Sequence, residues 1–102
     1  MFLAMNRFKV LSGSEAAFEE VWRNRRSRLD EMPGFVSFNL MRGPEGDDHT
    51  LFASHTIWES EEAFRAWTTS EQFRESHRGA GANKPLYIGH PEFEGFTRVE
   101  GV

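Results

Sequence analysis

Three residues of this sequence are of types that could do chemistry in a pocket: Asn6, Trp67 and His77. His77 comes four residues after Phe73, so the two would share one face of a helix, and we expect His77 to point toward the apolar side. A surface or structural histidine is the ordinary alternative. A single neutral imidazole suits haem iron, which takes one proximal histidine, better than structural zinc, which takes four ligands.

Asn6 is the one strongly polar residue on its face of an apolar strand. The same face carries Phe2, Ala4, Phe8 and Val10. An amide in such a place needs a hydrogen-bond partner, or it costs about 1–3 kcal/mol. The partner is either a backbone group or a bound ligand. Trp67 is likewise open to two interpretations, as a packed core residue or as a wall that presses on a ligand.

Composition and charge exclude several other functions. The chain has 102 residues and no cysteine, which excludes thiolate zinc sites, disulfides and thiol nucleophiles. A net charge of −4 argues against sequence-independent binding to nucleic acid. The first apolar stretch is too short for a signal peptide, and no run approaches the length of a membrane span. We therefore expect a cytoplasmic protein that binds neither nucleic acid nor a membrane.

Alternating apolar residues predict four strands. They cover Phe2–Leu11, Phe35–Met41, Leu51–Trp58 and Glu92–Val99. On the second strand, Val36, Phe38 and Leu40 are expected on one face, with Phe35 on the other.

Two helical segments lie between these strands. The first is expected to open with a capping box formed by Ser12 and Glu15, and to end at the turn Met32-Pro33-Gly34. The second is capped by Ser60, and it breaks near Ser70, which can cap a fresh turn. Its C-terminal stop is predicted at Gly79, and a loop is predicted from there to Pro91.

The predicted order, β-α-β-β-α-β, is the ferredoxin-like α+β plan, in one domain over residues 1–102. Helices would cover one face of its antiparallel sheet. The other face is apolar in the second and third strands, so leaving it in water would be unfavourable. A second copy packed sheet against sheet would cover it, which predicts a homodimer.

The sequence resembles the IsdG family of haem-degrading monooxygenases, within the antibiotic biosynthesis monooxygenase (ABM) superfamily. The resemblance is carried by Asn6, Thr56-Ile57-Trp58-Glu59-Ser60, Phe64, Trp67, Phe73 and His77, together with Met32-Pro33-Gly34-Phe35. The Pro-Gly-Phe and Trp-Glu-Ser patterns are shared across the superfamily. The specific part is the trio of Asn6, Trp67 and His77.

The resemblance implies a dimeric α+β barrel with one haem pocket per subunit. His77 would be the axial ligand of the haem iron, Trp67 would press on the porphyrin, and Asn6 would hydrogen-bond the distal ligand. Phe64 and Phe73 would line the pocket, and Arg74 and Arg78 lie nearest in sequence for the propionates. Haem would be both substrate and oxygen-activating group, and a reductase or small reductant would supply electrons. Opening of the porphyrin would release iron and a bilin-type product.

Two other functions remain open at this stage. A cofactor-independent ABM-type oxygenase acting on a small aromatic substrate would use a similar pocket but would not need His77. The other is a binding module without catalysis, for haem or another ligand. RNA-recognition domains share the strand order, but they need exposed aromatics in a basic pattern on the central strands. This acidic chain has Ser37, Asn39 and Ser54 there instead.

Overall fold

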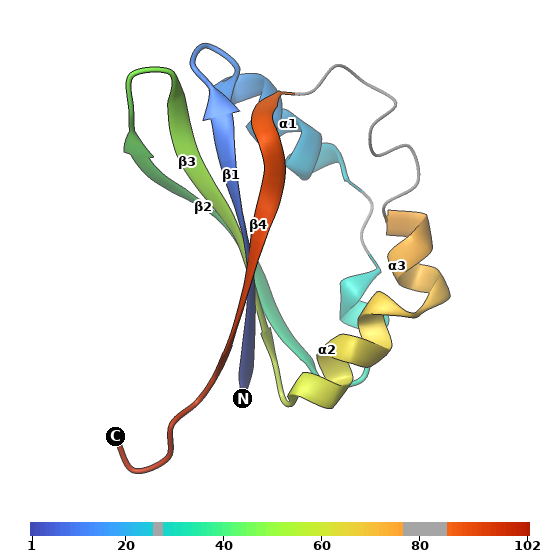
Figure 1. The fold of residues 1–102 in the computed structure, drawn as a ribbon. Helices are drawn as coiled ribbons and strands as arrows, with labels where there is room; N and C mark the ends of the chain where they lie inside the picture. The colour runs from blue at the N-terminus through green and yellow to red at the C-terminus, as the bar shows by residue number, and fades with distance from the viewer. Residues whose placement is uncertain (26–27, 77–85) are drawn as a thin grey trace.

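The computed structural model describes residues 1–25, 28–76 and 86–102. Its four strands form one antiparallel sheet in the order β2–β3–β1–β4. They are β1 (Phe2–Leu11), β2 (Phe35–Glu45), β3 (His49–Trp58) and β4 (Tyr87–Thr97). The helices are α1 (Glu15–Asn24), the 3-10 turn η1 (Leu29–Glu31), α2 (Glu61–Thr68) and α3 (Glu71–Ser76). Figure 1 shows the helices on one side of the sheet, which confirms the ferredoxin-like α+β fold.

The core on the helix-facing side of the sheet is divided into two clusters. The α1 cluster contains Phe8, Val10, Phe18 and Phe52, with Trp22, Leu40, Leu86 and Tyr87 packed against it. The α2 cluster contains Phe2, Ala4, Leu29, Trp58 and Trp67, with Met32, Phe35, Phe38, Ala63, Phe64 and Phe73 packed against it. Along β1, Asn6 is the position between the two clusters, because Ala4 belongs to one and Phe8 to the other.

β2 contains an irregularity that the alternation of its sequence did not predict. Phe35 pairs with Trp58, while Ser37 pairs with Ile57, so one extra residue lies between them on β2. The extra residue turns Phe35 toward the helices, where its ring packs edge-on against Trp58 at a centroid distance of 5.8 Å. Val36 is 54% exposed instead. The predicted facing of Phe35 and Val36 is therefore wrong, because a bulge reverses the alternation.

β4 begins at Tyr87, five residues before the predicted start at Glu92, so the end of the predicted loop is strand. The pairing with β1 shifts between Arg7 and Lys9, which pair with Glu92 and Ile88. Gly89 within the shifted stretch has a φ of +66°, a conformation that favours glycine. Glycine and proline usually indicate a loop, but Gly89 and Pro91 both lie in β4, where a bulge next to a sheet edge accommodates them.

α1 starts and ends differently from the prediction. Its N-cap is Ser14 rather than Ser12, and the Ser14 side chain makes no capping hydrogen bond. The Glu15 carboxylate instead accepts hydrogen bonds from the Gly13 N–H and from the Thr50 hydroxyl, both at 2.8 Å. α1 ends at Asn24, well before the predicted stop at Met32. No helix among the described residues is long and apolar enough to cross a membrane.

Candidate functional site

A row of four residues crosses the sheet at the boundary between the two clusters. Asn6 on β1 pairs with Ser54 on β3 and with Phe93 on β4, and Ser54 pairs in turn with Leu40 on β2. Directly paired residues point to the same side of a sheet, so this central row lies on the helix-facing side. The row therefore brings two polar side chains into the interval between two apolar clusters.

The Asn6 side chain is half-buried in this row. Within residues 1–25, 28–76 and 86–102, no side chain or backbone group forms a hydrogen bond with its amide. A backbone partner was the structural alternative for this residue, and the described part of the chain offers none. The described residues therefore do not supply the partner that this amide needs.

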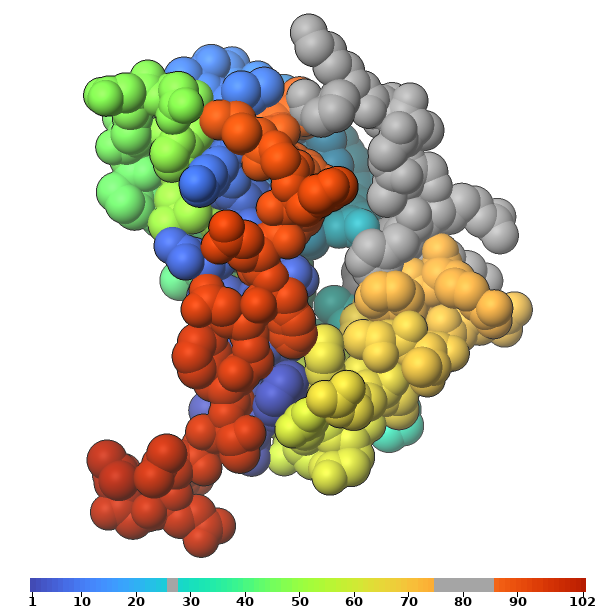
Figure 2. Space-filling model, viewed as in Figure 1, coloured from blue at the N-terminus to red at the C-terminus, as the bar shows by residue number. Residues whose placement is uncertain are grey.

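Two serine side chains cap the starts of α2 and α3, the two helices that lie across from the central row. The Ser60 hydroxyl accepts a hydrogen bond from the Ala63 N–H at 3.1 Å and starts α2. The Ser70 hydroxyl accepts one from the Phe73 N–H at 3.0 Å and starts α3. Both predicted caps are confirmed, and so is the break between the two helices. Figure 2 shows the surface hollowed between β4 and this α2–α3 segment.

Three of the predicted site residues lie in or against the α2 cluster. Trp67 is only 6% exposed, and its ring lies 6.2 Å from that of Trp58 and 5.3 Å from that of Phe73. Phe64 lies between the rings of Phe2 and Phe93, at centroid distances of 5.3 and 5.4 Å. Trp67 therefore packs as a core residue, and its ring contacts Phe73 of α3.

Phe93 connects these aromatics to Asn6. It is the β4 neighbour of Asn6, it touches Phe64, and it is 47% exposed. Phe93 is not among the site residues predicted from the sequence. Only the register between β1 and β4 shows that Phe93 lies beside Asn6.

The predicted iron ligand, His77, lies outside the described residues, as do Arg78 and the predicted helix stop at Gly79. Arg74 of α3 is exposed. In the described ranges no three His, Asp or Glu side chains come close enough together to hold a metal ion. The structure thus brings Phe64, Trp67 and Phe73 together in or against the α2 cluster, and Phe93 links Phe64 to Asn6. The role of His77 stays a prediction.

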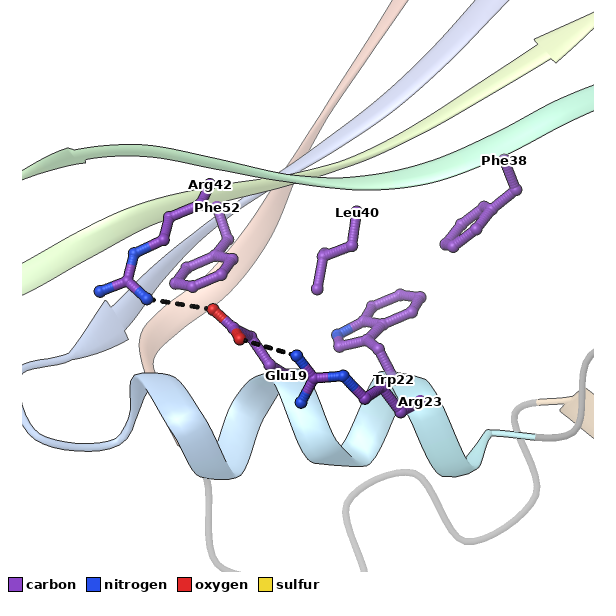
Figure 3. Close-up of a pocket in the computed structure, with 7 residues that line it drawn as sticks. All are labelled: Glu19, Trp22, Arg23, Phe38, Leu40, Arg42 and Phe52. Atoms are coloured by element: carbon purple, nitrogen blue, oxygen red, sulfur yellow. Dashed lines mark hydrogen bonds and ion pairs between the residues drawn. The ribbon is translucent and has the colours of Figure 1, made fainter.

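A separate cavity of about 390 Å³ lies between α1 and the strands β2 and β3 (Figure 3). It is lined by Glu19, Trp22, Arg23, Phe38, Leu40, Arg42 and Phe52. The Glu19 carboxylate is paired with the guanidinium groups of Arg42 at 3.1 Å and Arg23 at 3.2 Å, so its charge is already balanced. None of the predicted site residues lines this cavity, although Leu40 belongs to the central row.

The end of α1 carries a half-buried cation. The Arg25 guanidinium lies over the Trp22 ring, 4.6 Å from its centroid. Burial lowers the pKa of Arg25, and the nearby Tyr87 opposes that shift. Arg25 is not among the predicted site residues, because spacing alone does not show which arginines of α1 lie against an aromatic ring.

Comparison with known proteins connects this geometry to a family. The sequence profile described as antibiotic biosynthesis monooxygenase matches residues 1–79. A heme oxygenase (mycobilin-producing) from Mycobacterium tuberculosis is 32% identical over 99 residues, which cover 95% of this chain and 90% of that protein.

Two solved structures are similar in fold. MhuD, a heme-degrader from M. tuberculosis solved with two hemes bound in its active site, is 28% identical with a TM-score of 0.73, over 100% of this chain and 99% of that one. SnoaB, a cofactor-independent oxygenase from Streptomyces nogalater, is 26% identical with a TM-score of 0.68, over 99% and 95%. The resemblance predicted from the sequence is confirmed: the chain belongs to the antibiotic biosynthesis monooxygenase family.

Proposed function

We propose that this protein is a haem-degrading monooxygenase, a haem oxygenase that opens the porphyrin with dioxygen and electrons and releases iron and a bilin-type product. The observation that carries the proposal is the 32% identity with a heme oxygenase over 95% of this chain. The haem-bound structure of MhuD, which covers the whole chain, supports the same substrate.

The residues present fit a flat, largely apolar ligand with one polar centre. Aromatic side chains border the central row, with Phe93 in it and Phe64 against Phe93. The Asn6 amide, which has no partner in the described part of the chain, supplies a hydrogen-bond donor at the middle of the row. This combination matches a porphyrin, whose ring is apolar and whose centre carries a polar axial ligand.

Each predicted site residue then has a role in holding haem. Haem, when bound, supplies both the ring that is cleaved and the iron at which dioxygen reacts. His77 holds the iron through its imidazole, and Asn6 donates a hydrogen bond on the opposite side of the ring. Phe64 and Phe73 form the apolar wall, and the packing of Trp67 on Trp58 and Phe73 fixes that wall in place from behind.

The similarity to SnoaB favours a second candidate, a cofactor-independent oxygenase acting on a small aromatic substrate. Such an enzyme would use the same aromatic wall without iron. The two functions differ in one requirement, which is the His77 imidazole.

A hemin titration of the purified protein distinguishes them. We expect a saturable shift of the Soret band, which the change His77→Ala removes because the iron loses its protein ligand. His90→Ala is the matched control, since His90 is an exposed histidine on β4, and it should bind hemin as the parent does. Absence of a saturable shift in the parent would exclude haem as the ligand, and an unchanged shift in His77→Ala would remove the histidine from its role.

Turnover separates an enzyme from a haem carrier. Adding a reductant in air should bleach the Soret band and release iron that a chelator detects. Asn6→Ala should keep hemin binding and lose turnover, because only the hydrogen bond at the polar centre is removed. Asn24→Ala, at the exposed end of α1, is the control and should react at the parental rate. Full turnover in Asn6→Ala would return Asn6 to a structural role.

We also propose that the chain acts as a single-domain homodimer in the cytoplasm, with an external electron donor, either a reductase or a small reductant. The sheet face away from the helices supports the dimer, because Leu3, Met5 and Leu51 share it and are only half-buried in one copy. Packing this face on a second copy would remove its apolar surface from water. Light scattering on a sizing column should give twice the mass of the chain, and a monomer at micromolar concentration would contradict the proposal.

A further inference from the structure

β3 carries two buried residues with hydroxyl side chains, Thr50 and Ser54, and within the described part of the chain only one of the two hydroxyls is hydrogen-bonded. Thr50 is 0% exposed, and its hydroxyl donates a 2.8 Å hydrogen bond to the Glu15 carboxylate. Ser54 is 5% exposed, and its hydroxyl has no hydrogen-bond partner in the described ranges 1–25, 28–76 and 86–102. The described side-chain atoms that are sealed from solvent without a partner are His55 Nδ1 and Trp58 Nε1, so the Ser54 hydroxyl is not among them and remains free to bond a neighbouring group.

The position of Ser54 suggests what its partner is. Ser54 pairs directly with Asn6 across β1 and β3, and both belong to the central row between the two clusters. The Cβ atoms of directly paired residues lie about 4.5–5.5 Å apart. A hydroxyl on one strand therefore reaches the amide on the other through side-chain rotation alone, without movement of the strands.

An asparagine amide has a donor end and an acceptor end, and the two can exchange by rotation. An anionic or oxygen ligand at the polar centre needs the donor end, the Nδ2–H group of Asn6. Rotation by half a turn would present Oδ1 and repel the ligand. A hydroxyl that donates to Oδ1 holds the productive orientation.

We propose that Ser54 is a positioning residue for Asn6: when haem is bound, the Ser54 hydroxyl rotates to donate a hydrogen bond to Asn6 Oδ1, a bond that the structure itself does not contain, and so directs Asn6 Nδ2–H toward the distal ligand. This inference rests on the proposed function, because the ligand in question is the one bound on the far side of the haem from the protein's axial ligand. Ser54 acts through Asn6 and does not itself touch the reacting atoms.

The test is a double-mutant cycle with azide as an anionic probe. Ferric haem complexes of the parent, Ser54→Ala, Asn6→Ala and the double variant are titrated with azide, and the dissociation constant is read from the visible spectrum. We expect Ser54→Ala to raise the azide dissociation constant by about five-fold, the ratio that loss of one ordinary hydrogen bond gives. In the Asn6→Ala background the same change should have no effect, because the amide that Ser54 orients is gone.

Thermal unfolding of the haem-free protein provides the structural control. Ser54→Ala should leave the melting temperature unchanged, since its hydroxyl has no partner in the described part of the chain. Thr50→Val should lower it, since that change removes the bond to Glu15. A melting temperature that falls in Ser54→Ala as it does in Thr50→Val would give Ser54 a structural role and overturn the inference.

The remaining outcomes are also distinct. An unchanged azide constant in Ser54→Ala overturns the inference alone, as long as hemin still gives its Soret shift. An effect that persists in the Asn6→Ala background means that Ser54 acts directly on the ligand, which contradicts a positioning role. If hemin does not bind to the parent at all, the proposed function fails, and the inference fails with it.

Discussion

The Ser70 cap, which starts α3, allows a prediction whose magnitude follows from the structure. α3 has six residues, far fewer than the roughly 12–15 that make an isolated helix even marginally stable. Its first turn depends on the hydrogen bond from the Phe73 N–H to the Ser70 hydroxyl, at 3.0 Å. We expect Ser70→Ala to destabilise the protein by loosening α3.

The expected cost is that of one helix cap. The Ser70 hydroxyl also donates to the Trp67 carbonyl at 2.6 Å, but the Ser70 backbone N–H donates to the same carbonyl at 3.0 Å. The carbonyl therefore keeps a partner in Ser70→Ala, and the main loss is the cap. Loss of a serine cap costs about 1 kcal/mol, which lowers the melting temperature of a domain this size by about 4 °C.

Urea and thermal unfolding measure this cost, and α1 supplies the matched control. Ser14 is the N-cap of α1 but makes no side-chain capping bond, so Ser14→Ala should cost little. Because α3 carries Phe73 and precedes His77 in sequence, Ser70→Ala should also weaken hemin binding, by at most the five-fold that about 1 kcal/mol allows. Equal stability losses in Ser70→Ala and Ser14→Ala would show that the cap does not support α3.

Two further predictions concern backbone and pH. Gly34 has a φ of +84°, and an added Cβ would come within 2.5 Å of the Ala63 Cβ, whereas Gly13 has a φ of +91° and open space around it. Gly13→Ala should therefore cost about 1–2 kcal/mol from the backbone alone, and Gly34→Ala should cost more in the same urea titration. The hydrogen bond from Thr50 is the largest cause of the lowered pKa of Glu15. The ionised Glu15 carboxylate stabilises the folded protein above about pH 4.3, the ordinary glutamate pKa. This stabilisation is lost as the pH falls through the lower pKa that Glu15 has in the folded state. The difference in free energy of unfolding between the parent and Thr50→Val should accordingly shrink as the pH is lowered. A difference that does not change with pH would show that the stabilising bond does not depend on the ionised Glu15 carboxylate.

The features that the sequence predicted well are those whose cause is local. Ser60 and Ser70 bond to amides three residues ahead, so the caps and the break between α2 and α3 are visible in a short stretch of sequence. The isolation of Asn6 on an apolar strand face is local in the same sense.

The features that were missed depend on partners far away in the chain. The bulge that turns Phe35 inward exists because β2 pairs with β3 in a particular register. Glu15 bonds to Thr50 in addition to Gly13, which no capping pattern reveals. For the same reason the neighbours of Asn6, which are Ser54 and Phe93, became site residues only once the strand pairing was known.

The division of the core into an α1 cluster and an α2 cluster has a thermodynamic consequence. A flat apolar ligand in the interval between them would join both clusters into one continuous core, so its binding free energy would add to the free energy of unfolding. At a free concentration 100 times the dissociation constant, that addition is about 2.7 kcal/mol, a large fraction of the stability of a small domain. The amount of folded protein in a cell would then rise with the supply of its own substrate, since the ligand-free chain would be the form that proteases remove.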